Sequence, residues 1–104
     1  MENIRMLDHL TKESLTENLA TRFKVSLGDT NSVELELIRV DELASAPGQQ
    51  QLSVIFRGPV DVPLPQTTYN LEHERLGQSS LFLVPVGIEK EGRLYEAFFN
   101  RFIK

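Results

Sequence analysis

The stretch SSLFLVPVGIEKEGRLYEAFFNRFI, residues 79–103, decides the fold. A nearly continuous apolar run over 79–86 is followed by a charged turn over 88–92 that ends in glycine, and then by an alternating run over 93–103. Two such runs joined by a short turn predict a pair of antiparallel strands. Because the first run is apolar on both faces, we expect a strand that is covered on both sides or that closes a barrel. Pro85 predicts an edge position or a β-bulge near the end of this strand.

Alternation of apolar and polar residues continues through the rest of the chain. Leu15 and Leu19 lie one turn apart and Thr11 can serve as an N-cap, so a short helix is expected over residues 10–19. Further strands are predicted over residues 21–27, 32–43, 51–58 and 67–73. The apolar phase slips within 32–43, which predicts a bulge or a bend. About six strands with short connections predict a mainly β fold, either a small antiparallel barrel or a two-layer sandwich, with a short N-terminal helix.

Length and composition predict one β-rich domain over residues 1–104. Apolar residues make up 40% of the chain and charged residues 25%, which is typical of a globular protein. The chain has no cysteine, so it can form neither a disulfide nor a thiolate metal site, and its composition favours the reducing cytoplasm. We find no apolar run of signal-peptide or membrane-spanning length, and therefore expect a soluble protein that does not act in a membrane.

The charge balance argues against a nucleic-acid partner. Eleven Lys and Arg residues stand against fifteen Asp and Glu, which gives a net charge of -4, and the basic residues are spread along the chain. A field of this sign repels a phosphate backbone. Aromatic residues on a small barrel can also stack on single-stranded bases, but this reading needs a basic stripe on the folded surface. We expect four aromatic side chains to fill the core instead: Phe23, Phe56, Tyr69 and Phe82.

The sequence Glu72-His73-Glu74 is the most suggestive polar group. Successive side chains of a strand point to opposite faces, so His73 cannot share a ligand shell with either glutamate without a bend. A structural His73 is therefore favoured over a catalytic or metal-ligating one. Glu34 and Glu36 share a strand face but form the outward set of an amphipathic strand. No phosphate-binding or nucleophile motif is present, and we predict no catalytic, cofactor-binding or metal-binding residue, and no cofactor.

The aromatic C-terminal run is the candidate interaction surface. Phe98, Phe99, Phe102 and Ile103 supply more apolar surface than one face of one strand needs. Arg57 stands at a strand end, where it can pair with Asp61 or with a partner's carboxylate, although an ordinary surface ion pair is the simpler reading. We therefore expect another protein, or a second copy of this chain, to bind through a strand edge. The candidate contact residues are Arg57, Phe98, Phe102 and Ile103.

Several short sequence motifs in the second half of the chain resemble those of a known family. They are Phe-Arg-Gly-Pro at 56–59, Pro-Leu-Pro-Gln at 63–66 with Thr-Tyr-Asn-Leu-Glu-His at 68–73, Leu-Phe-Leu-Val-Pro-Val-Gly at 81–87, and Tyr-Glu-Ala-Phe-Phe-Asn at 95–100. With them the chain resembles a family of bacterial domains of unknown function and similar length. The resemblance implies a small β-rich fold and domains that look like companions of phage-tail or tail-fibre-like genes. It assigns no catalytic residue.

Two functional hypotheses follow. The favoured one is a non-enzymatic interaction or accessory module, linked by the resemblance to phage-tail-like assemblies. The alternative is a small-molecule-binding β-barrel or minimal enzyme whose site lies near Tyr69 and His73, with Glu72 at the same mouth. This alternative requires a concave pocket with convergent polar groups.

Overall fold

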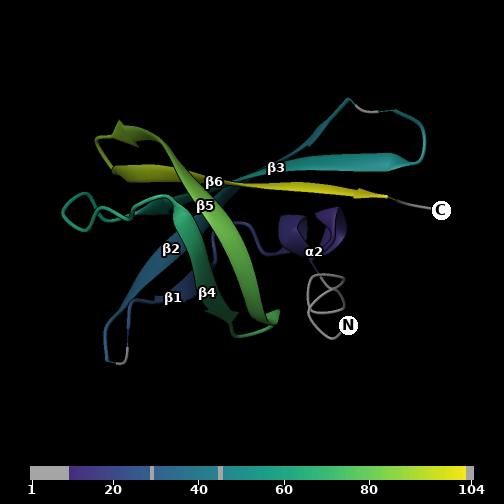
Figure 1. Ribbon diagram of the computed structural model, residues 1–104. Coiled ribbons are helices and arrows are strands. Elements are labelled where there is room, and N and C mark those ends of the chain that lie inside the picture. The colour runs from purple at the N-terminus through teal and green to yellow at the C-terminus, as the bar shows by residue number, and fades with distance from the viewer. Residues whose placement is uncertain (1–9, 29, 45, 103–104) are drawn as a thin grey trace.

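The structure, a computed structural model, describes residues 10–28, 30–44 and 46–102 and consists mainly of β-strands (Figure 1). In chain order the elements are α2 (Lys12–Glu17), β1 (Arg22–Ser26), β2 (Ser32–Leu43), β3 (Gln49–Gly58), β4 (Thr67–His73), β5 (Gly77–Glu89) and β6 (Gly92–Phe102). Among the described residues, no helix is long and apolar enough to cross a membrane.

The six strands close into a barrel in the order β1-β2-β3-β6-β5-β4, with antiparallel neighbours throughout. Closure between the first and last strands is short, because β1 and β4 pair only at Lys24 with Glu72 and at Val25 with Leu71. The predicted mainly β fold with a short helix is thus confirmed, and of the two expected architectures the chain adopts the barrel.

Alternate residues of each strand point into the barrel and form one continuous core. On β3, for example, Leu52, Val54 and Phe56 are fully buried. The other buried apolar residues are Leu10, Leu15, Phe23, Val25, Leu35, Leu37, Leu64, Leu71, Leu81, Leu83, Tyr95, Ala97 and Phe99. Side chains therefore fill the interior, as expected for a barrel of this size.

Two of the four aromatic side chains expected in the core are placed differently by the structure. Phe23 and Phe56 are buried and meet edge to face, with ring centroids 5.2 Å apart. Tyr69 is only partly buried, at the margin of the core. Phe82 is 50% exposed, so the prediction that it fills the core is wrong. The apolar run of β5 is covered on one face only, and Phe82 lies on the other face.

Local sequence signals explain the irregular points of the fold. The Thr11 side chain accepts a hydrogen bond from the Ser14 N–H and the Ser14 side chain accepts one from the Thr11 N–H, a capping box that starts α2. The register between β2 and β3 shifts between Leu37 and Arg39, where the apolar phase slips. The register between β5 and β6 shifts directly after Pro85. Both bulges were expected from the sequence.

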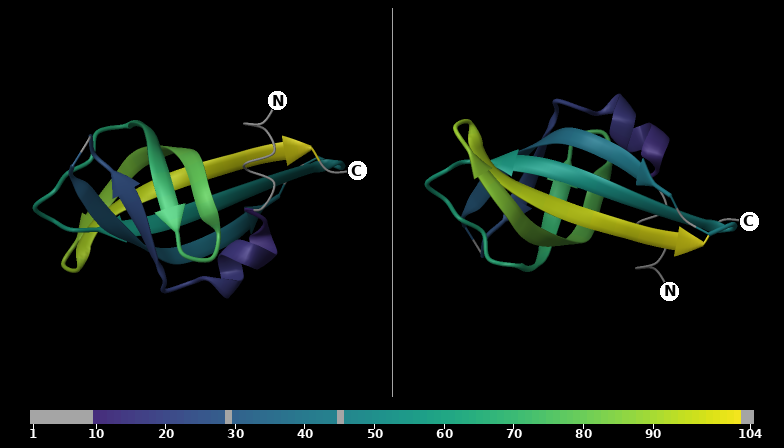
Figure 2. Two further views of the ribbon diagram at one scale, coloured as in Figure 1. Left: turned by 90° about the horizontal axis from the view of Figure 1, so that it is seen from below. Right: turned by 90° about the horizontal axis from the view of Figure 1, so that it is seen from above.

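A ribbon made of the ends of β2, β3 and β6 projects beyond the barrel (Figure 1; Figure 2). β1 pairs with β2 only as far as Glu36, and β5 pairs with β6 only as far as Glu96. By contrast, β3 and β6 stay paired from Gly58 with Arg93 to Gln49 with Phe102. In Figure 1 this ribbon extends to the right, above α2. The helix is tied to the ribbon by an ion pair of 3.2 Å between Lys12 and Glu42.

The Tyr95 hydroxyl anchors the proline-rich connection between β3 and β4 to the core. It accepts a hydrogen bond from the Leu64 N–H at 3.0 Å, and both residues are buried. We expect Tyr95→Phe to lower the free energy of unfolding by about 1–3 kcal/mol, because it leaves a buried N–H without a partner. Urea denaturation measures the loss.

Tyr69→Phe is the matched control for Tyr95→Phe. The Tyr69 hydroxyl donates to the Pro65 carbonyl of the same connection, but at an exposed position where water can replace it. The loss should therefore be smaller than that for Tyr95→Phe. Equal losses for the two variants would contradict the anchoring role of Tyr95.

Candidate interaction surface

Hydrogen bonds at the base of the ribbon determine which way the backbone groups of β3 point. The Leu37 N–H donates to the Thr21 carbonyl and the Leu37 carbonyl accepts from the Ala20 N–H, so both Leu37 groups face the β1 side. Leu37 and its partner Phe56 are therefore a pair without mutual hydrogen bonds. Backbone groups of a strand alternate in direction, so Phe56 faces β6 and its partner Tyr95.

The same alternation assigns the backbone groups of β6. Ala97, Phe99 and Arg101 face β3, as Tyr95 does, whereas Phe98, Asn100 and Phe102 face the opposite edge. The position of Pro85 is consistent with this assignment. Pro85 pairs with Tyr95 and has no N–H, and the backbone groups of Tyr95 face β3, so Tyr95 needs no hydrogen bond from Pro85. No described strand pairs with β6 beyond Glu96 on that side. Among the described residues, the N–H and C=O groups of Phe98, Asn100 and Phe102 therefore form an open strand edge, which we call the β6 edge.

The side chains beside the β6 edge are apolar and exposed. Phe98 is 52% exposed and Phe102 is 82% exposed. Both lie on the outer face of the ribbon, while Phe99 between them is buried on the inner face. The prediction that the aromatic run has surplus apolar surface is confirmed for Phe98 and Phe102. Ile103, the third apolar candidate, lies outside the described residues.

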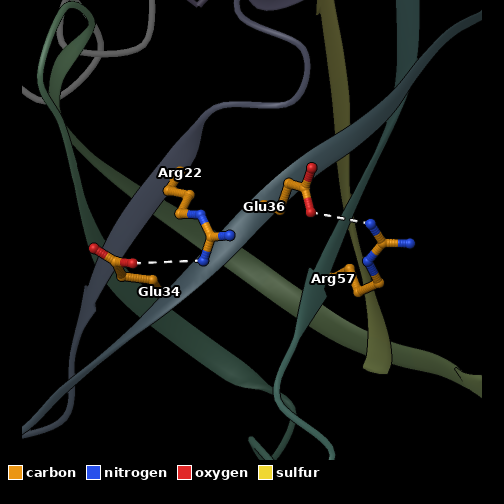
Figure 3. Close-up of polar contacts among 4 residues, drawn as sticks. All are labelled: Arg22, Glu34, Glu36 and Arg57. Carbon is orange, nitrogen blue, oxygen red and sulfur yellow. Dashed lines mark hydrogen bonds and ion pairs between the residues drawn. The ribbon is translucent and has the colours of Figure 1, made fainter. Parts of the chain in front are cut away.

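Charged side chains on the outer face gather at the barrel end of the ribbon and pair with one another. Arg22 and Glu34 form an exposed ion pair of 3.7 Å, and Glu36 and Arg57 form a half-buried pair of 3.0 Å (Figure 3). Arg57 therefore bonds to a carboxylate on the neighbouring strand β2 rather than to Asp61. This geometry fits the interpretation of Arg57 as a member of an ordinary ion pair within the fold. Arg57 also lies away from the β6 edge.

Toward the tip of the ribbon the outer face loses its charges. Phe98 lies opposite Ser53. The last positions along the ribbon are uncharged, namely Asn100, Gln51, Leu43, Phe102 and Gln49. Exposed strand edges in monomeric proteins are usually protected by charges, prolines or short length. The outer face at the β6 edge has neither charge nor proline among the described residues.

The other edge of the ribbon, along the end of β2, is protected. Arg39 and Asp41 form an ion pair of 2.6 Å there, and Glu42 pairs with Lys12 of α2. An incoming strand would have to displace the helix or separate these charges. Of the two edges of the ribbon, the β6 edge is the one without such charged pairs among the described residues.

The three residues of the alternative site do not converge on one point, because Tyr69 lies apart from Glu72 and His73. Glu72 is exposed while Leu71 and His73 are buried, so Glu72 points to the face opposite His73. Tyr69 shares the face of His73 but is four residues away along β4, about 13 Å, and its hydroxyl bonds to Pro65. An open depression of the surface between β1 and β4 is lined by both Glu72 and His73, but Tyr69 does not line it.

Hydrogen bonds occupy both ring nitrogens of His73. Nδ1 accepts from the Arg75 and Leu76 N–H groups at 3.0 and 3.1 Å, and Nε2 lies 2.8 Å from the Thr21 hydroxyl. The Thr21 hydroxyl donates to the Asn18 carbonyl at 2.6 Å. With Nδ1 acting as an acceptor, the neutral ring carries its proton on Nε2 and donates it to Thr21. This geometry holds His73 as a structural residue.

His73 gives the stability of the fold a dependence on pH. Desolvation by burial lowers the pKa of His73 and the Arg75 charge lowers it further, while Glu74 acts in the opposite direction. The unfolded chain has the ordinary value of about 6.5, so it binds a proton that the folded state resists. The stabilisation is complete above about pH 6.5 and is lost as the pH falls toward the folded pKa.

We expect His73→Asn to flatten this pH dependence. The asparagine oxygen can replace Nδ1 as the acceptor for the Arg75 N–H but does not titrate. Thermal unfolding at about pH 7.5 and about pH 5.5 should show a smaller fall in Tm for the variant than for the parent chain. His9 is present in both proteins, so the difference isolates His73. Equal falls in Tm would mean that His73 protonates as freely in the folded state as in the unfolded one.

Fold and surface together define a small closed β-barrel with a projecting ribbon and an open, uncharged strand edge. Residues 10–99 match the model of the family described as Domain of unknown function (DUF6916), and the chain belongs to this family. The match confirms the expected membership of a family of domains of unknown function. No curated protein and no solved structure matches the chain. The family description assigns no activity, and the matched range ends within the β6 edge.

Proposed function

We propose that this protein is a non-enzymatic interaction module that binds an extended protein segment along the β6 edge. One observation carries the proposal: three edge-facing backbone positions, Phe98, Asn100 and Phe102, coincide with two exposed phenyl rings on one face. Backbone groups of an open edge supply affinity for another strand, and side chains beside it supply selectivity. The ring pair favours an apolar or uncharged segment over a charged one.

The charges of the surface favour a protein partner over a nucleic acid. The net charge is -4. Arginine groups that a phosphate backbone would need are already bonded within the fold: Arg22, Arg39 and Arg57 to carboxylates, Arg75 to Asn18, Arg93 to the Val60 carbonyl and Arg101 to the Leu10 carbonyl. We place the module in the cytoplasm as part of the proposal, in keeping with a chain that lacks cysteine.

The setting we propose is a multi-subunit assembly. Small modules that add a strand to a neighbour's sheet can join subunits with few residues, because the backbone supplies most of the contact. The resemblance to domains that accompany phage-tail-like genes supports such an accessory role. In this setting the barrel serves as the rigid base and the ribbon as the joint.

Site-specific photo-crosslinking tests the proposal in the cell that makes the protein. A photoreactive phenylalanine analogue is placed at Phe98, Phe102 or the control position Val60, which is 42% exposed on the connection after β3. We expect covalent products, identified by mass spectrometry, from positions 98 and 102 but not from 60. Products that are absent, or equally abundant from all three positions, would contradict the proposed function.

A further inference from the structure

We infer that the segment bound at the β6 edge is the same edge of a second copy, paired antiparallel about a two-fold axis at Asn100. This inference rests on the proposed function and names its partner. A two-fold contact requires a surface that is complementary to itself. The outer-face residues of the edge have this property, because Phe98, Asn100 and Phe102 read Phe, Asn, Phe in either direction.

The backbone geometry fits the same axis. With Asn100 opposite Asn100 of the second copy, Phe98 lies opposite Phe102 of that copy. All three positions face the edge, so each forms a pair that exchanges two N–H···O=C bonds. A shift by one residue would bring edge-facing groups opposite groups already bonded to β3. A shift by two residues would break both Phe98–Phe102 pairs.

The outer-face side chains at the contact are uncharged, so no charges repel one another there. Each Phe98 ring meets a Phe102 ring of the other copy, and cross-strand aromatic pairs of this kind are favourable. The two Asn100 amides can donate to and accept from each other, because each has both kinds of group. Glu96, the acid of β6 on this face, accepts a hydrogen bond from Ser53.

The one cation of the contact segment lies on the inner face. The Arg101 guanidinium donates to the Leu10 carbonyl at 2.6 Å and lies 5.3 Å from the centre of the Phe99 ring. Both interactions are within one copy, so the dimer need not break them.

Pairing joins the two ribbons into one continuous sheet of six strands. With about five residues paired per copy, the interface falls below about 1,200 Å², the range of weak and transient contacts.

A cysteine at position 100 tests the axis directly. Cα atoms of an antiparallel hydrogen-bonded pair lie about 5.5 Å apart, within the span that a disulfide bridges. The chain has no other cysteine, so a disulfide in Asn100→Cys can only join two copies. We expect rapid covalent dimerisation under mild oxidation. The control Lys90→Cys, in the turn at the opposite end of β6, should dimerise only slowly.

Proline at the same position tests the backbone contact without a disulfide. Asn100→Pro removes an N–H that faces the edge and leaves the bonds to β3 intact, whereas Asn100→Ala keeps the N–H. Sedimentation equilibrium over a concentration series should show a monomer–dimer equilibrium in the parent chain. We expect Asn100→Pro to weaken this equilibrium about tenfold or more relative to Asn100→Ala, which corresponds to about 1.4 kcal/mol.

The outcomes separate the inference from the proposed function. Faster cross-linking of Asn100→Cys than of Lys90→Cys, with proline weakening the dimer more than alanine, supports the two-fold pairing. A monomer at every concentration, with Asn100→Cys dimerising no faster than Lys90→Cys, overturns it. If photo-crosslinks from position 98 then identify a different protein, the interaction module still stands. If they identify no protein, both proposals fail.

Discussion

Replacing Phe98 and Phe102 together by serine is expected to abolish most of the self-association of this chain. The two-fold contact contains two Phe98–Phe102 pairs, and an aromatic pair contributes about 0.5–1.5 kcal/mol beyond the area that it buries. We therefore expect the dimer dissociation constant to rise by about tenfold or more. Sedimentation equilibrium of the double variant and the parent chain measures this change.

The same double substitution should leave the fold intact. Phe102 is 82% exposed, so its replacement should change the free energy of unfolding by no more than about 0.5 kcal/mol. Phe98 is 52% exposed, so the loss of its half-buried ring should lower the free energy of unfolding by about 1 kcal/mol. The matched control is Val86→Ser with Ile88→Ser, two apolar residues of β5 with exposures of 50% and 59%. If this control weakens association as much as the double phenylalanine variant, general surface hydrophobicity drives the association instead of the β6 edge.

Gly92→Ala is expected to cause a large loss of stability. Gly92 begins β6, and a Cβ there would overlap the Gly58 carbonyl oxygen and would lie 2.8 Å from the Cγ of Arg57. A side chain can rotate away from a clash, but a backbone carbonyl that belongs to the sheet cannot. We expect the free energy of unfolding to fall by about 3 kcal/mol, the upper end of the usual range for overpacking. Chemical denaturation measures the loss.

Two other glycines provide controls for Gly92→Ala. A Cβ at Gly87 meets only Leu94, at an ordinary contact distance of 3.8 Å, so Gly87→Ala should be nearly neutral. Gly77 has open space but a φ of 75°, so Gly77→Ala should cost about 1–2 kcal/mol through backbone strain alone. A loss for Gly92→Ala no greater than that for Gly77→Ala would show that the approach of Gly92 to Gly58 is not as close as described.

Most of the fold could be predicted from local patterns. The strand over 32–43 has the same bounds in the sequence prediction and in the structure, and the bulge after Leu37 was visible as a slip in phase. The strand predicted from residue 51 begins at Gln49 instead, because Gln49 and Gln50 pair with β6. Phe82 was misassigned because an apolar run does not reveal whether one or both faces are covered.

The candidate site was only partly predictable. Surplus apolar surface at Phe98 and Phe102 follows from composition and alternation, and the structure confirms it. Asn100 was missed, because its part in the edge depends on where β5 leaves β6, which the closure of the barrel determines. The partner of Arg57 likewise depends on the strand register, which places Glu36 beside it. Closeness in sequence suggested Asp61 instead. An uncharged Phe-Phe-Asn sequence at a strand end was the available signal for the edge.

Residue-resolved amide hydrogen exchange along β6, at low and high protein concentration, tests the open edge most directly. In dilute solution the amides of Ala97, Phe99 and Arg101 should exchange slowly because they bond to β3, while those of Phe98 and Asn100 should exchange fast. At high concentration the two fast amides should become protected as copies pair. Protection of Phe98 and Asn100 in the dilute monomer would show that the β6 edge is already covered, and would contradict the proposal that another strand pairs there.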